Sequence, residues 1–117
     1  MSINKGALEV KVLVQIAEEL SELIPGFLAR KREDVSSLRR ALESGELDAI
    51  ARLAHRIKGE GGSYGFHAIS EIGLQMERAT KAGDVHGIQR SIKALSEYLE
   101  NVEVMYVADE QPEPLNA

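Results

Sequence analysis

Four amphipathic stretches joined by short connections constrain the fold of this chain more than any other feature of its sequence. Apolar residues recur at helical spacing over about residues 18–43, 47–64, 68–82 and 85–104. The connections contain Gly45, Gly65 and Gly83, and glycine commonly ends helices. Helices joined this closely must run antiparallel to their neighbours. The sequence therefore predicts an all-α, up-and-down four-helix bundle.

The two ends of the chain differ from these four stretches. Residues 1–17 begin polar and then become apolar with imperfect alternation, which we interpret as an additional N-terminal helix or arm that packs on the bundle. Residues 18–107 are the expected bundle domain, in which Pro25 marks either a kink or a new helix start. Residues 108–117 are acidic, contain proline and have few large apolar groups, so we expect a disordered tail. No strand is expected.

Composition argues against several classes of protein. The chain has 117 residues and 44% hydrophobic content, enough for one domain with a modest core. It has no cysteine, and therefore no disulfide framework and no thiolate metal site, which is compatible with a reducing compartment. Neither a membrane span nor a signal peptide is evident, so we expect a cytoplasmic protein that does not bind membranes. No large unsatisfied apolar face is evident, which favours a monomer.

Nucleic-acid, metal and nucleotide sites are not indicated either. The basic runs at 30–32 and 39–40 are interleaved with acidic residues on a chain of net charge −5, so we interpret them as a solvated face. The three histidines lie on or before three different helices without an E-x-x-H pair, which argues against a metal site. The sequence has no nucleophile elbow and no glycine-rich nucleotide-binding motif after a strand.

One histidine stands out because of its neighbours. Residues 53–66 read LAHRIKGEGGSYGF. On a helical wheel the buried stripe of this helix excludes His55 and consists of Ile50, Leu53, Ala54, Ile57, Gly61 and Tyr64. Each of the mid-helix glycines at positions 59, 61 and 62 costs about 1 kcal/mol relative to alanine, so stability does not explain them.

The residues next to His55 favour a functional histidine. Ala51, Lys58, Gly59 and Gly62 lie one or two turns away on the same strip of the helix. Their mostly small side chains would let the surface of another protein approach the ring closely. A lone histidine on a helix is usually only a solvated side chain, but that interpretation leaves the glycines unexplained and makes Lys58 a coincidence.

The segment around His55 resembles a family signature. Residues 54–66, AHRIKGEGGSYGF, are similar to the signature of histidine-containing phosphotransfer (HPt) domains of two-component phosphorelay signalling, in which His-x-(Leu/Ile)-Lys-Gly precedes small residues and Gly-(Leu/Phe). The match runs through His55, Ile57, Lys58, Gly59, Gly62, Gly65 and Phe66. With the upstream stretch LIPGFL at 23–28, the resemblance covers about residues 18–105. Glu60 departs from the pattern, but on the wheel it points away from His55.

This resemblance implies a phosphocarrier rather than an enzyme with its own substrate pocket. His55 would exchange a phosphoryl group with the aspartate of a response-regulator receiver domain, and a histidine kinase would be a further partner. Lys58 would neutralise charge on the phosphoryl oxygens. Glu77 on the next helix would orient the imidazole, with a solvated Glu77 as the alternative. No cofactor is expected in this chain, because the metal ion of such a transfer would belong to the receiver domain.

A partner surface around His55 is expected as well. It consists of Ala51, Arg52, Arg56, Gly59, Gly62 and Lys81. The small residues would give clearance, and the cations would form a basic patch that attracts the carboxylate-rimmed site of a receiver domain.

The alternative from another class is a docking module that binds a receiver domain or kinase without being phosphorylated. The intact His55 and Lys58 argue against it, because a docking surface needs neither. The donor, the recipient, the pathway and the direction of transfer stay open. The initiating methionine favours a free-standing protein over an excised domain of a larger kinase.

Overall fold

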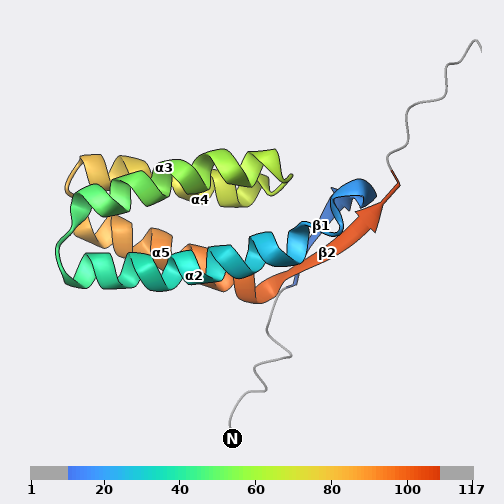
Figure 1. The fold of residues 1–117 in the computed structure, drawn as a ribbon. Helices are drawn as coiled ribbons and strands as arrows, with labels where there is room; N and C mark the ends of the chain where they lie inside the picture. Colours follow the sequence, from blue (N-terminus) through green and yellow to red (C-terminus); the bar gives the residue numbers. More distant parts are fainter. Residues whose placement is uncertain (1–10, 109–117) are drawn as a thin grey trace, which may run out of the picture.

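The structure, a computed structural model, describes residues 11–108 and contains four consecutive α-helices. These are α2 (Ile24–Glu43), α3 (Leu47–Ser63), α4 (His67–Lys81) and α5 (Val85–Asn101). Strand β1 (Val12–Ala17) and the short 3-10 helix η1 (Glu18–Leu20) precede them, and strand β2 (Val102–Val107) follows. α3 packs on α4, α4 on α5, and α2 on both α3 and α5, which makes an antiparallel bundle (Figure 1). The predicted four-helix bundle is confirmed.

The turns between the helices share one backbone arrangement. After α3, Gly65 adopts a φ of 90°, and its N–H donates to the carbonyl of Gly62 at 3.1 Å. The N–H of Phe66 donates to the carbonyl of Gly61 at 2.7 Å, which completes a Schellman motif at the helix end. The glycines that follow α2 and α4 repeat this pattern. The ends of these three helices therefore lie close to where the glycines predict them.

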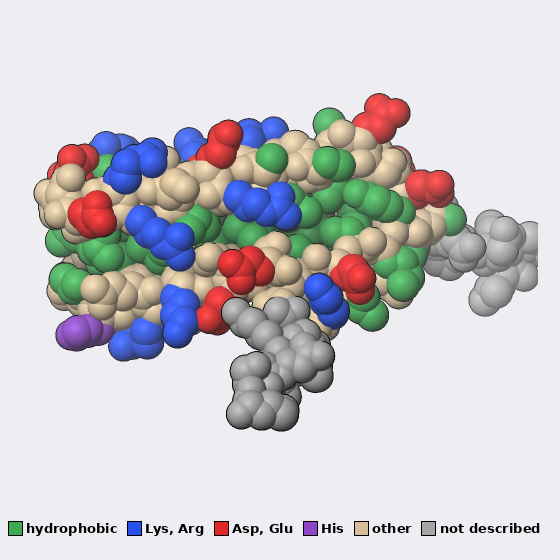
Figure 2. Space-filling model, turned by 90° about the horizontal axis from the view of Figure 1, so that it is seen from below, with side chains coloured by type: hydrophobic (Ala, Val, Ile, Leu, Met, Phe, Trp, Pro, Cys, Tyr) green, Lys and Arg blue, Asp and Glu red, His purple; other side chains and the backbone are tan. Residues whose placement is uncertain are grey.

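The core lies between the helices and takes side chains from all four. Phe27 of α2 stacks on Tyr64, with ring centroids 4.4 Å apart, and on Phe66 at 5.4 Å. These contacts attach the turn between α3 and α4 to the start of α2. Seen from below the bundle, apolar side chains form a strip flanked by charged side chains of both signs (Figure 2). The fully buried apolar side chains include Phe27, Leu38, Ile50, Ile57, Phe66, Ile69, Met76, Ile88 and Leu95.

The buried stripe of α3 follows the helical-wheel prediction. It also shows that the glycine at position 61 is required for helix packing. The buried residues of α3 are Ile50, Ala54, Ile57 and Gly61. A Cβ added at Gly61 would lie 2.5 Å from the backbone nitrogen of Ser70 on α4. Only glycine lets the two helices approach this closely. A surface left bare for a partner can therefore explain Gly59 and Gly62, but Gly61 is needed for packing.

The two strands correct the sequence analysis. β1 pairs with β2 in parallel, from Val12↔Val102 to Ala17↔Val107, and the sheet projects from one end of the bundle (Figure 1). The expectations of no strand and of a last helix that reaches residue 104 are wrong. The valines of β2 suit a strand, but its partner lies about ninety residues earlier, so no local pattern reveals the pairing.

Parts of the predicted termini lie outside the described residues. These parts are residues 1–10 of the expected arm 1–17 and residues 109–117 of the expected disordered tail 108–117. Val12–Ala17 of the expected arm forms β1 and is paired with the strand that follows the last helix. Within residues 11–108, no helix has both the length and the apolar character that crossing a bilayer requires.

Candidate functional site

His55 and Glu77 form the centre of the site, where α3 contacts α4. The side chain of His55 is 70% exposed, whereas that of Glu77 is only 11% exposed. The two groups are hydrogen-bonded through His55 Nδ1 and Glu77 Oε2, which lie 3.0 Å apart. A nearly buried carboxylate therefore holds one edge of an exposed imidazole ring.

Two lysines complete the Glu77 cluster, which we define as His55, Lys58, Glu77 and Lys81. Lys58 Nζ donates to Glu77 Oε1 at 2.9 Å, and Lys81 Nζ lies 3.9 Å from Oε2. The hydrogen bonds from Lys58 and His55, together with attraction to both lysines, hold the pKa of Glu77 below its ordinary value of 4.5. Glu77 is therefore ionised at neutral pH.

The charge of Glu77 decides which nitrogen of His55 is free. A carboxylate only accepts hydrogen bonds, so Nδ1 carries the proton that points at Oε2. In the neutral ring, Nε2 is then unprotonated, and its lone pair is available to an electrophile. The ammonium of Lys58 binds the same carboxylate and is 36% exposed, so it can also reach an anionic group held at the ring.

Two residues of α4 that the sequence analysis did not identify contact the backbone of α3 beside this cluster. Ser70 Oγ donates to the carbonyl of Lys58. Gly73 faces the backbone of Lys58 so closely that an added Cβ would lie 2.6 Å from its nitrogen. The available signal was a glycine in the interior of a helix, four residues before Glu77 and therefore on the same face.

The residues of the expected partner surface differ in their packing. Arg52, Gly59, Gly62 and Lys81 are exposed, and Ala51 is partly buried. A Cβ added at Gly59 would meet no atom within 4 Å, and one at Gly62 would lie 3.5 Å from Ser70 Oγ, an ordinary contact. Packing within the described chain therefore does not require glycine at either position. A role of these residues in partner binding stays a prediction.

Arg56 of the expected partner surface is exposed, and its ion-pair partners lie outside the Glu77 cluster. Its guanidinium donates to Asp34 on α2 at 3.0 Å and lies 4.0 Å from the carboxylate of Glu60. The buried ammonium of Lys31 donates to the same two acidic residues. Arg56 thus belongs to a second group, the Lys31 cluster of Lys31, Asp34, Arg56 and Glu60, which joins α2 to α3. Glu60, the departure from the HPt signature, takes part in this contact.

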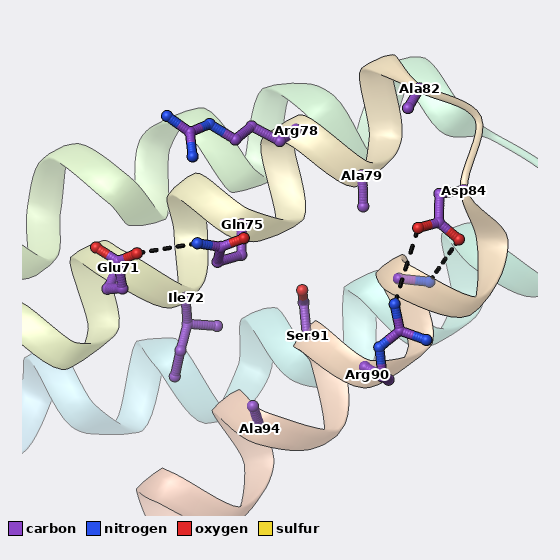
Figure 3. Close-up of a pocket in the computed structure, with 11 residues that line it drawn as sticks. Glu71, Ile72, Gln75, Arg78, Ala79, Ala82, Asp84, Arg90, Ser91 and Ala94 are labelled. Atoms are coloured by element: carbon purple, nitrogen blue, oxygen red, sulfur yellow. Dashed lines mark hydrogen bonds and ion pairs between the residues drawn. The ribbon is translucent and has the colours of Figure 1, made fainter.

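A groove of about 500 Å³ lies between α4 and α5 (Figure 3). Two pairs of polar side chains lie along it: Gln75 donates to Glu71 at 3.0 Å, and Arg90 lies 3.8 Å from Asp84. None of its lining residues belongs to the Glu77 cluster. In residues 11–108, no group of three or more His, Asp or Glu side chains is placed to hold a metal ion. The groove is therefore separate from the Glu77 cluster.

Comparison with known families confirms the resemblance that the sequence analysis indicated over about residues 18–105. The Hpt domain family model matches residues 22–104. This range contains all four α-helices and every residue of the Glu77 cluster. Searches among curated proteins and solved structures gave no significant match. The family match therefore covers the bundle that positions the site as well as the site itself.

Proposed function

The chain belongs to the Hpt domain family of histidine phosphotransfer modules, and we propose that it is a phosphorelay intermediate in which His55 carries the phosphoryl group. One observation carries this assignment to His55: Nδ1 of its exposed ring lies 3.0 Å from Oε2 of the nearly buried Glu77, at hydrogen-bond distance. That hydrogen bond leaves Nε2 as the nucleophile. The proposed partners are a receiver domain and a histidine kinase.

The proposed transfer needs only groups that the Glu77 cluster and a receiver domain provide. The lone pair of Nε2 attacks the phosphorus of an aspartyl phosphate, the N–P bond forms, and the P–O bond to the aspartate breaks to release a carboxylate. The ring then carries a positive charge with its proton still on Nδ1, next to the carboxylate of Glu77. Attack by a receiver aspartate on phosphorus reverses these steps and returns the neutral ring.

Charge around the ring supports the same proposal. The chain carries a net charge of −5, yet Arg52, Lys58 and Lys81 lie on or beside the helical surface that bears His55. Phosphoryl transfer depends mainly on positioning and charge neutralisation. The positive charges of these side chains would therefore stabilise the negative oxygens of a phosphoryl group bound to the ring. In this proposal the metal ion belongs to the receiver domain and the chain acts as a carrier. A cytoplasmic location and a monomeric state stay predictions.

Intact-mass measurement tests the proposal. The protein is incubated with phosphoramidate and, separately, with a phosphorylated receiver domain, and each product is then treated with acid. We expect one added phosphoryl group that is lost in acid, because a phosphorus–nitrogen bond to imidazole is acid-labile. His55→Gln should fold normally and gain no mass, whereas His86→Gln, an exposed histidine of α5, should behave as the unchanged protein.

Two results would contradict the proposal. A folded protein that gains no phosphoryl group from either donor is not a phosphocarrier, and if it still binds receiver domains it is a docking module. A His55→Gln variant that is phosphorylated as fully as the unchanged protein would place the acceptor elsewhere.

A further inference from the structure

The backbones of α3 and α4 are in close contact at Gly73. A Cβ added there would lie 2.6 Å from the nitrogen of Lys58, 2.9 Å from its Cα and 3.0 Å from the carbonyl oxygen of Ala54. Ordinary van der Waals contact of a Cβ begins at 3.4 Å. All three atoms belong to the backbone, so no change of rotamer can make room for a methyl group. Any side chain at position 73 must therefore displace one helix from the other.

A hydrogen bond holds the same part of α3 from one turn earlier on α4. Ser70 Oγ donates to the carbonyl of Lys58. Ser70 and Gly73 are three residues apart and lie on one face of α4. Both therefore act on the backbone of Lys58, one by attraction and the other by the absence of a side chain.

Glu77 stands on this same face, four residues after Gly73. The α3 residues that Gly73 approaches, Ala54 and Lys58, lie on either side of His55 in the sequence. The distance of 3.0 Å between His55 Nδ1 and Glu77 Oε2 thus depends on how closely the two backbones approach next to it. An N–H···O hydrogen bond weakens beyond about 3.2 Å. We therefore expect the displacement that a Cβ at Gly73 requires, from 2.6 Å to 3.4 Å, to lengthen and weaken this one.

We propose that Gly73 and Ser70 are positioning residues of the phosphoacceptor site. They keep α4 at the spacing at which Glu77 accepts the Nδ1 proton of His55, and they thereby maintain Nε2 as the free nitrogen. The consequence for phosphoryl transfer rests on the proposed function, whereas the consequence for the ring does not. A glycine that serves packing alone would affect stability without changing the state of the ring.

Gly73→Ala tests the proposal through the ring nitrogens of His55. Their ¹⁵N chemical shifts report which nitrogen carries the proton in the neutral ring. We expect the unchanged protein to show the Nδ1–H tautomer, and Gly73→Ala to lose this preference. The rate of phosphorylation by phosphoramidate should fall about 10- to 100-fold, the usual effect of losing a partner that orients a histidine.

Gly26→Ala is the matched control. Gly26 is an exposed residue of the first turn of α2, and an added Cβ would come no closer than 3.5 Å to another atom, the end of the Arg30 side chain. The same substitution there should leave the tautomer and the rate unchanged. A folded Gly73→Ala variant with the tautomer and rate of the unchanged protein would overturn the proposal.

A double substitution separates positioning from general disturbance. If Gly73 acts through Glu77, adding Gly73→Ala to Glu77→Ala should cause no further loss of rate, because the hydrogen bond is already absent. Losses that multiply in the double variant would show that Gly73 acts by another route, and would overturn the proposal.

Ser70→Ala is the second variant and decides the matter if Gly73→Ala does not fold. It removes the hydroxyl that donates to Lys58 without adding bulk. We expect a partial loss of the Nδ1–H tautomer and a rate about five-fold lower, the factor that corresponds to one neutral hydrogen bond. A Ser70→Ala variant in which His55 keeps the full Nδ1–H tautomer would contradict a positioning role of Ser70. If the unchanged protein takes no phosphoryl group, the proposed function fails, while the tautomer measurements still test the positioning.

Discussion

Glu77 is the single residue on which the site depends most, because its carboxylate contacts His55, Lys58 and Lys81 together. We expect Glu77→Ala to reduce the rate of phosphorylation by phosphoramidate about 10- to 100-fold, since the ring loses its orienting partner. Glu77→Gln should lose less, because an amide oxygen still accepts from Nδ1. Glu71→Gln, an exposed carboxylate on the same helix, is the control and should change nothing. A Glu77→Ala rate equal to that of the unchanged protein would remove Glu77 from the mechanism.

The ionisation of Glu77 also links stability to pH. Hydrogen bonds from Lys58 and His55 lower its pKa in the folded protein below the ordinary value of 4.5. A carboxyl group with a lowered folded-state pKa stabilises the fold above its unfolded-state pKa, and this contribution is lost as the pH falls through the folded-state value. The stability difference between the unchanged protein and Glu77→Gln should therefore persist near neutral pH and shrink below pH 4.5. Urea unfolding at several pH values measures it, and a difference that stays constant into strong acid would contradict the link.

The sequence predicts the place of some residues in the site but not of others. His55 and Lys58 follow from spacing on one helix, because residues three apart share a face. Glu77 was expected only through the family resemblance, and the structure brings it to His55. Ser70 and Gly73 act on the backbone of a different helix, and no periodicity within α4 specifies which residues of α3 they meet. The ion pair of Arg56 could not be predicted for the same reason, since Asp34 lies on α2.

At the scale of elements, the Lys31 cluster joins α2 to the helix that carries His55. Lys31 is 1% exposed and binds Asp34 and Glu60. Lys31→Met keeps most of the volume but leaves buried negative charge with less compensation, so we expect the free energy of unfolding to fall by about 2 to 4 kcal/mol. Chemical denaturation measures this loss.

An exposed ion pair gives the control for Lys31. Lys93 is 75% exposed and lies 3.9 Å from Glu97 on the same helix. Lys93→Met should change the free energy of unfolding by less than about 0.5 kcal/mol. Equal effects of the two substitutions would mean that the Lys31 cluster contributes no more than a surface pair.

Helices and strands differ in how much local sequence reveals. Each helix repeats its apolar residues at a short period, so its own residues predict it, and the glycines that follow α2, α3 and α4 also mark where those three end. Each strand has only six residues, and it pairs with a segment at the opposite end of the described chain. The apolar residues of β2 directly follow α5 and continue its apolar character, which is why the last helix was expected to extend too far.

At the scale of the whole molecule, the sheet brings together the segments on either side of the bundle. A two-stranded sheet is at best marginally stable alone, so this one needs contact with the helices. Ile16 of β1 provides such a contact: it is 2% exposed, and its Cδ1 lies 3.0 Å from where a Cβ on Gly65 would stand. The turn between α3 and α4 therefore supports the sheet.

Two alanine substitutions in β1 test this dependence. Ile16→Ala removes a buried side chain at the contact with the bundle and should lower the free energy of unfolding by about 2 to 4 kcal/mol. Leu13→Ala, at a position that is 62% exposed, should lower it by less than about 0.5 kcal/mol. Amide hydrogen exchange adds a local measurement, because loss of the Ile16 contact should speed exchange in both strands more than in α3 or α4. If Ile16→Ala is as mild as Leu13→Ala and strand exchange is unchanged, the sheet does not depend on the bundle through Ile16.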